Sequence, residues 1–447
     1  MEFSNFTPFP ALAFESFAPN GASFHTVVLR QTFELRNGSL VLAQKQKPLA
    51  TTDRFFGEPN QSSVVEESDL APYKPFCDVL VDATAYVPQG RPLPRFAVGV
   101  RLTSAPMITD RASATASTQV LLDRRLVVMG ERYFVRRSTL VRYLNKAVAI
   151  GTFGAVRRAD WKLTAPKPIA ALPVRYEYAW GGQCRVNADH AAAGRVPKAV
   201  RLDDQQQAGH PDQGQIPVAH TTCEANPVGL GFACRWYVKA MKLRQVAAPQ
   251  IEAAGQSITV QAWLRASEEQ SPASLRPAGI GVVGKAWTTR LSLAGTYDER
   301  WLAERHPGLP DDFQFRYWNG AHADMQVPHL KGNETLVLTN LVPHGTLHSK
   351  VDERGNTTLR IPLPGHLPMG WIYTDQGLGF APFLLDTLSV DLSETTKPEV
   401  TLVWRATLMK SVRAQRFEAR FIDSDEMARL SASTPTVLDG SAGERHG

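Results

Sequence analysis

Short segments in which apolar and polar residues alternate, separated by turn residues, make up most of the chain. Successive side chains of a β-strand point to opposite faces of a sheet, so this pattern predicts strands with one buried face. The clearest pair, residues 25–35 and 40–42, is separated by Asn37 and Gly38. This dipeptide predicts a hairpin, because both residues tolerate positive φ. Further strands are expected at residues 78–87, 95–102, 124–129, 257–264, 334–341, 346–351, 357–363, 387–392, 399–408 and 414–422.

Helical periodicity is scarce. Residues 138–150 are the best case, with Ser138 suited to cap the N-terminus and Gly151 just beyond the last periodic residue. Shorter helices are expected at residues 298–305 and 424–431. The sequence therefore predicts a mainly β protein, with lobes built as antiparallel β-sandwiches or open barrels, long loops and few short helices.

The expected organisation has three parts. Residues 1–329 form an N-terminal β-rich lobe, residues 330–430 a C-terminal β unit, and residues 431–447 a flexible tail rich in small and polar residues. Within the first lobe, residues 183–224 are rich in Gln, His, Asp, Gly and Ala and show almost no apolar periodicity. They are interpreted as a polar loop insertion, either mobile or used for binding a partner.

Composition narrows the class of protein. Of the 447 residues 43% are hydrophobic and 21% charged, which excludes wholesale disorder. The net charge of +6 is spread along the chain without a long basic run, so nucleic acid is not an expected partner. The N-terminus lacks the features of a signal peptide, no stretch is long and apolar enough to span a membrane, and only four cysteines occur. We therefore expect a cytoplasmic protein that does not bind membranes.

Metal ligands are present but poorly spaced. The polar insertion contains Cys184, His190, His210, His220 and Cys223. Structural zinc sites pair their ligands two to five residues apart, and only His220 and Cys223 meet that spacing. We therefore expect neither a metal nor another cofactor.

Catalytic motifs are not recognised. Acidic residues occur in adjacent pairs, but neighbouring side chains diverge on both strands and helices, whereas glycoside hydrolysis needs two facing carboxyl groups. Asp298 and Asp312 are better explained as turn or cap residues. No nucleophile elbow, phosphate-binding loop or dinucleotide fingerprint is found, so the chain is not expected to be an enzyme.

Dense clusters of charged and aromatic residues are not readily explained by the alternating pattern of the strands. Such clusters can hold loops in place through buried contacts, or they can form a rigid surface for a protein partner. The candidate partner-binding residues are Asp69, Tyr73 and Lys74 in one cluster, Arg175, Glu177 and Trp180 in a second, and Tyr297, Asp298 and Trp301 in a third.

These clusters also carry a family resemblance. The blocks concerned follow one another in order at residues 5–10, 62–79, 176–182, 226–231, 295–301, 309–313 and 330–334. Together they resemble a bacterial domain-of-unknown-function family encoded beside PAAR-tipped effectors and VgrG spike proteins of type VI secretion systems. Its members are regarded as effector chaperones or adaptors, and no catalytic residues are carried over.

The resemblance implies an adaptor that binds a PAAR-linked toxic effector and aids its loading onto the VgrG spike. It implies the effector, and possibly VgrG, as partners and leaves the oligomeric state open. The alternatives are a carbohydrate-active hydrolase on a β scaffold, using acids such as Asp298 and Asp312, and a structural component of a phage-tail-like assembly.

Overall fold

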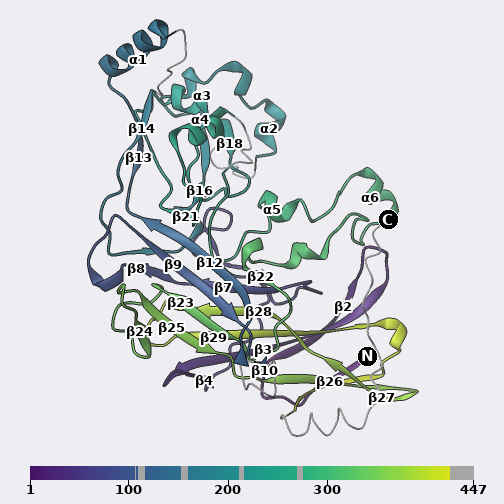
Figure 1. Ribbon diagram of the computed structural model, residues 1–447. Helices are drawn as coiled ribbons and strands as arrows, with labels where there is room; N and C mark the ends of the chain where they lie inside the picture. The colour runs from purple at the N-terminus through teal and green to yellow at the C-terminus, as the bar shows by residue number, and fades with distance from the viewer. Residues whose placement is uncertain (106, 109–115, 153–159, 211–215, 269–274, 423–447) are drawn as a thin grey trace.

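The computed structural model describes residues 1–105, 107–108, 116–152, 160–210, 216–268 and 275–422. Strands dominate and the helices are few and mostly short, as expected from the alternating pattern. Figure 1 shows two parts: a body of layered sheets, and an upper lobe that carries helices α1 to α4. In the described ranges, no helix combines the length and apolar character needed to span a membrane.

The largest sheet of the body has seven strands. Their order is β2 (Ala11–Phe17), β3 (Ser23–Arg36), β29 (Glu399–Met409), β28 (Leu384–Asp391), β7 (Cys77–Asp82) and β22 (Gln326–Val327), with β4 (Ser39–Leu42) also paired to β3. All neighbours are antiparallel except β28 and β7. Asn37 and Gly38 join β3 to β4 with φ of 51° and 76°, so the predicted hairpin is confirmed.

Two further sheets complete the body. A six-stranded sheet runs β21 (Ile251–Ala253), β12 (Val120–Met129), β9 (Arg95–Thr103), β23 (Thr335–Thr339), β25 (Thr357–Pro362) and β24 (Ser349–Val351). A four-stranded sheet runs β1 (Glu2–Asn5), β30 (Arg416–Ile422), β26 (Leu367–Thr374) and β27 (Gly377–Pro382). Apolar residues from all three sheets meet in one core cluster, as alternating strands with one buried face require.

The expected boundary at residues 329/330 does not separate two sheets. β29 and β28, from the C-terminal quarter, lie between β3 and β7 of the N-terminal quarter, and β23 lies beside β9. Residues 330–422 therefore complete sheets that residues 1–129 begin. The expected tail, residues 431–447, and the expected helix at 424–431 lie outside the described residues.

The upper lobe is built from the middle of the chain and has its own small cores. Its helices are α1 (Thr139–Gly151), α2 (Asp204–Ala208), α3 (Arg235–Ala240) and α4 (Val260–Glu268). Its strands are β13 (Tyr133–Arg136), β14 (Trp161–Leu163), β16 (Trp180–Gly181), β17 (Gln183–Asn187), β18 (Pro217–Thr222), β19 (Leu230–Gly231) and β20 (Gln245–Ala247). Trp263 of α4 lies at the centre of the larger core, stacked on Phe134 with ring centroids 4.4 Å apart.

The remaining elements are short. Helices α5 (Thr288–Leu291) and α6 (Glu299–Glu304) lie beside the body, and the small strands are β5 (Arg54–Phe55), β6 (Val64–Glu66), β8 (Thr84–Tyr86), β10 (Met107–Ile108), β11 (Ala116–Ser117) and β15 (Ala171–Pro173). Single-turn helices occur at Pro88–Gly90, Tyr176–Tyr178, Ala193–Arg195, Lys198–Val200, Phe315–Trp318, Ala323–Met325 and Lys410–Val412.

Two sequence-based expectations for the upper lobe are wrong. Residues 257–264, expected as a strand, lead into helix α4, where Val260, Trp263 and Leu264 recur at helical spacing and Thr259 Oγ1 accepts a hydrogen bond from the Ala262 amide at 3.1 Å. The β-branched run at residues 258–260 favoured the strand. Residues 183–224, expected as a polar loop, contain the antiparallel strand pair β17 and β18, whose Val186 and Ala219 pack with Ala192 and Val196.

Candidate functional site

The first predicted cluster lies inside the body. Asp69 is 8% exposed, and its carboxylate accepts hydrogen bonds at 2.8 Å from Arg30 Nη1 and from the Ala50 amide. Tyr73 is half-buried with its ring edge-on to Phe315, and burial raises the pKa of its hydroxyl. Asp69 therefore has no surface to offer a partner and holds residues 50–69 against strand β3.

Lys74 belongs to the same buried network. Its Nζ donates to Asp78 Oδ2 and to Thr387 Oγ1, both at 2.9 Å. Burial acts to lower the pKa of Lys74, but the carboxylates of Asp78 and Asp386 outweigh it and hold the pKa above its usual value. A buried charge of this kind is stable only while its partners are in place, so Lys74 ties strand β7 to strand β28.

The second cluster connects chain segments inside the protein. Glu177 accepts hydrogen bonds from the Ser63 amide at 2.7 Å and from Ser63 Oγ at 2.5 Å. Trp180 is 1% exposed, and its carbonyl accepts from Asn226 Nδ2 at 2.9 Å. Gly181 is required here, because a Cβ would lie 2.2 Å from the Asn226 carbonyl oxygen at a φ of 152°.

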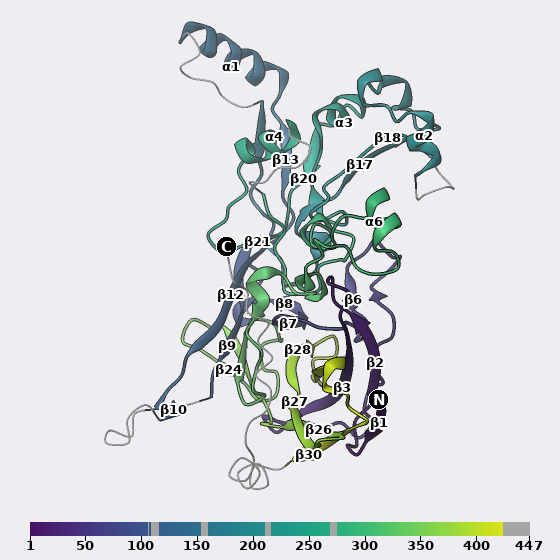
Figure 2. The ribbon, with the colours of Figure 1, turned by 90° about the vertical axis from the view of Figure 1, so that its right-hand side faces the viewer.

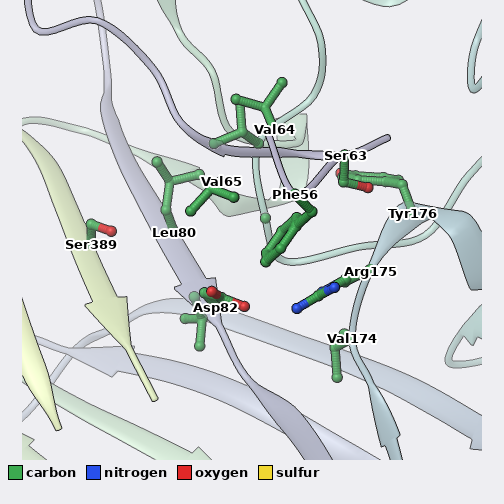
Figure 3. Close-up of a pocket in the computed structure, with 13 residues that line it drawn as sticks. Phe56, Ser63, Val64, Val65, Leu80, Asp82, Val174, Arg175, Tyr176 and Ser389 are labelled. Atoms are coloured by element: carbon green, nitrogen blue, oxygen red, sulfur yellow. The ribbon is translucent and has the colours of Figure 1, made fainter. Parts of the chain in front are cut away.

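Arg175 lines a small pocket near this cluster, shown in Figure 3. Its guanidinium lies 3.4 Å from the ring centroid of Phe56, and its head points toward Asp82. Burial and repulsion from Asp391 raise the pKa of Asp82, while Arg175 and Arg54 oppose the shift. The space is about 30 Å³, room for little more than a water molecule, so we interpret this pocket as a packing defect between β7 and β6.

The third cluster is at the surface. Tyr297 is 54% exposed, and its ring packs edge-on to Trp301 with centroids 4.7 Å apart. Asp298 caps helix α6 by accepting from the Trp301 amide at 2.8 Å, as its sequence context predicts. Trp301 Nε1 donates to the Gly308 carbonyl at 2.9 Å. Of the three clusters, this one has the most accessible members: Tyr297 and Asp298 are exposed, whereas the members of the other two clusters are buried or partly buried.

The two acids that the hydrolase alternative would use, Asp298 and Asp312, both accept hydrogen bonds from residues close to them in the structure. Asp312 accepts from the amide of Thr296 at 2.9 Å and from its hydroxyl at 2.8 Å, and these bonds lower the pKa of the Asp312 carboxyl. A general acid needs a raised pKa, so the shift runs against that role for Asp312.

Substituting Asp298 separates capping from catalysis. Asp298→Ala is expected to lower the free energy of unfolding by about 1 kcal/mol, because the Trp301 amide loses its acceptor. Asp298→Asn is expected to keep stability within about 0.5 kcal/mol, since Asn caps helices as well as Asp. Urea unfolding of both variants measures this. An Asp298→Ala variant as stable as the wild type would contradict the capping role, whereas loss of a hydrolytic activity in the stable Asn variant would assign Asp298 to catalysis.

The candidate metal ligands take part in local hydrogen bonds. Buried Cys184 accepts from the Cys234 amide at 3.2 Å, and His190 Nδ1 accepts from the Ala192 amide at 3.1 Å. The rings of His210 and His220 are hydrogen-bonded to each other at 2.8 Å. Among the described residues, no three His, Cys, Asp or Glu side chains gather in a group that could hold a metal ion.

Helix α1 presents the most unusual surface. It begins at the predicted cap, where the Val141 amide donates to Ser138 Oγ, and it projects from the top of the upper lobe in Figures 1 and 2. Five of its large apolar side chains are between 41% and 78% exposed; they are Leu140, Tyr143, Leu144, Val148 and Ile150. Spacings of three and four residues place them on one face, while Asn145 on the other side is buried.

The exposed apolar face of α1 is the reverse of what an ordinary surface helix shows, because such a helix buries its apolar face and exposes its polar one. The apolar spacing was visible in the sequence, but the direction in which that face points was not. Exposed apolar faces of this kind mark interaction sites.

A model of a protein family matches residues 20–405, which is most of the chain. Its description is an uncharacterized protein family conserved in bacteria, DUF2169. The chain belongs to this family. No curated protein and no solved structure matches this DUF2169 chain. The family limits extend from the loop before β3 to Arg405 of β29, so they enclose the seven-stranded sheet except for β2 and the end of β29.

Proposed function

We propose that this DUF2169 protein is an adaptor or chaperone that binds a PAAR-linked toxic effector and aids its loading onto the VgrG spike of a type VI secretion system. The observation that carries the binding role is the outward apolar face of α1, with Tyr143 and Ile150 each more than 70% exposed. Full burial of one such side chain contributes about 1.5–3 kcal/mol. The effector and the spike come from the family resemblance described above.

Other features support binding over catalysis. The buried clusters around Asp69, Lys74 and Trp180 make a rigid frame, which lowers the entropy lost when a partner docks. Strand β2 is an outer strand of the seven-stranded sheet and carries Leu12 and Phe17, both at least 40% exposed, as a second apolar surface. The hydrolase alternative has less support, because Asp298 and Asp312 are occupied in a cap and a turn.

Co-expression with the toxin encoded beside this gene tests the proposal. The adaptor is expected to co-purify with that toxin and to raise its soluble yield severalfold over expression of the toxin alone. A matched control is the variant Leu144→Glu/Ile150→Glu, which keeps the frame and disrupts the α1 face. If the wild-type protein neither co-purifies nor raises the yield, while an unrelated chaperone does, the adaptor function is contradicted.

A further inference from the structure

A wide basic cleft lies on the side of α1 opposite its apolar face. Its volume is about 970 Å³, and its walls come from β13, α1, the start of β14, α3 and α4. The cations that line it are Arg136, Lys146, Arg235, Lys239, Lys242 and Arg244. Only two acids line it, Asp160 and Glu268. The cleft therefore has an excess of positive charge several times that expected from the composition of the whole chain.

Little of this charge is neutralised within the protein. Arg235 lies 3.7 Å from Glu268. In the described part of the chain, the other five cations have no ion-pair partner. Like charges gathered on a concave wall raise the local concentration of anions, so the cleft favours an anionic ligand.

Asn145 is an unpaired polar group in the wall of the cleft. This residue of α1 lines the cleft and is 8% exposed, yet its Nδ2 has no hydrogen-bond partner among the described residues. A buried donor without an acceptor is unfavourable by about 1–3 kcal/mol. Nδ2 itself has less than 1 Å² of exposed surface, so a carboxylate oxygen in the cleft would satisfy it once the Asn145 side chain turns toward the cleft.

The rest of the lining indicates the class of ligand. Val238, Leu264 and Ala149 supply apolar contacts beside the cations. The two aromatic lining residues, Trp161 and Trp263, are 8% and 1% exposed, so neither offers an open ring for stacking a base. Nucleic-acid grooves combine basic residues with such open rings, so a protein segment is the better match.

We infer that the cleft between α1 and helices α3 and α4 binds an acidic, partly apolar segment of the partner protein, with Asn145 donating to one of its carboxylates. This inference deepens the proposed adaptor function and rests on it for the identity of the partner. It adds a contact surface distinct from the outward face of α1, so that a partner can hold α1 from both sides.

The first test uses the full chain and a labelled synthetic helical peptide with Glu and Leu at helical spacing. The variant Lys239→Glu/Lys242→Glu/Arg244→Glu is expected to weaken binding at least about tenfold at low salt. Lys350→Glu/Arg354→Glu/Arg360→Glu is the matched control, because it has the same net charge but alters exposed residues in and beside β24 and β25. Equal loss in both variants would overturn the inference, and so would tighter binding of a single-stranded oligonucleotide than of the peptide.

The variant Asn145→Leu distinguishes a binding role of Asn145 from a structural one. It is expected to weaken peptide binding severalfold while leaving thermal stability unchanged or raised, because it removes an unpaired buried donor. Loss of stability with unchanged binding would show that Asn145 only supports the fold, and would contradict its role as a donor.

Co-purification separates this inference from the adaptor proposal. If the wild-type protein retains the toxin and the cleft variant loses it, both stand. If the cleft variant retains the toxin as well as the wild-type protein does, the cleft inference fails and the adaptor proposal survives. If the wild-type protein does not retain the toxin, the adaptor proposal fails, and the peptide measurement alone decides the cleft.

Discussion

Replacing Asp78 by alanine is expected to lower the free energy of unfolding by about 3–5 kcal/mol. Asp78 is fully buried and accepts from Lys74 Nζ at 2.9 Å, Asn319 Nδ2 at 3.0 Å and the Gly320 amide at 2.9 Å. Without it, the ammonium of Lys74 stays buried with only part of its compensation, and three further donors lose an acceptor: Asn319 Nδ2 and the amides of Gly320 and Ala321. The loss is large because both Lys74 and residues 319–321 depend on one carboxylate.

Chemical denaturation of Asp78→Ala and of Asp375→Ala measures this effect. Asp375 is an exposed turn residue between β26 and β27, so its replacement is expected to change stability by no more than about 0.5 kcal/mol. The double variant Lys74→Met/Asp78→Asn removes the buried ion pair as a unit and is expected to recover much of the loss. Equal stability of the Asp78 and Asp375 variants would contradict the buried network.

Replacing Trp263 by alanine is the second large effect, with an expected loss of about 3–5 kcal/mol. Trp263 is 1% exposed, stacks on Phe134, meets Trp161 with centroids 5.0 Å apart, and donates from Nε1 to the Gly231 carbonyl at 3.0 Å. The cavity would open in the core of the upper lobe. Hydrogen exchange should therefore quicken in β13, β14 and α4 far more than in β3 and β29.

Tyr143→Ala is the matched aromatic control. Tyr143 is 72% exposed on α1, so its removal is expected to change stability by no more than about 0.5 kcal/mol. A loss comparable with that of Trp263→Ala would mean that the α1 face is packed against the protein in solution, which contradicts its availability to a partner.

Local signals in the sequence predicted the elements well. Alternation between apolar and polar residues located β3, β9, β25 and β29, and the caps at Ser138 and Asp298 located α1 and α6. These features depend on neighbouring residues only, so they can be read without knowing the fold.

Features that depend on distant residues could not be predicted. The sequence places Lys74 among the candidate partner-binding residues, because nothing near it in sequence shows that Thr387 will meet it across a parallel strand pair. The division at residues 329/330 follows the order of the chain, whereas β3 pairs with β29 across nearly its whole length. Likewise, the amphipathic pattern of α1 is the same whether its apolar face packs on a core or points to solvent.

Helix α1, and not the buried clusters, is the contact surface that we propose for the partner. Hydrogen–deuterium exchange of residues 139–151, in the free protein and in the purified complex with the neighbouring toxin, tests it most directly. Exchange across α1 is expected to slow at least about tenfold in the complex, while the already protected segments around Asp69 and Trp180 change little. Unchanged exchange across α1 in a stable complex, with new protection confined to other surfaces, would contradict it.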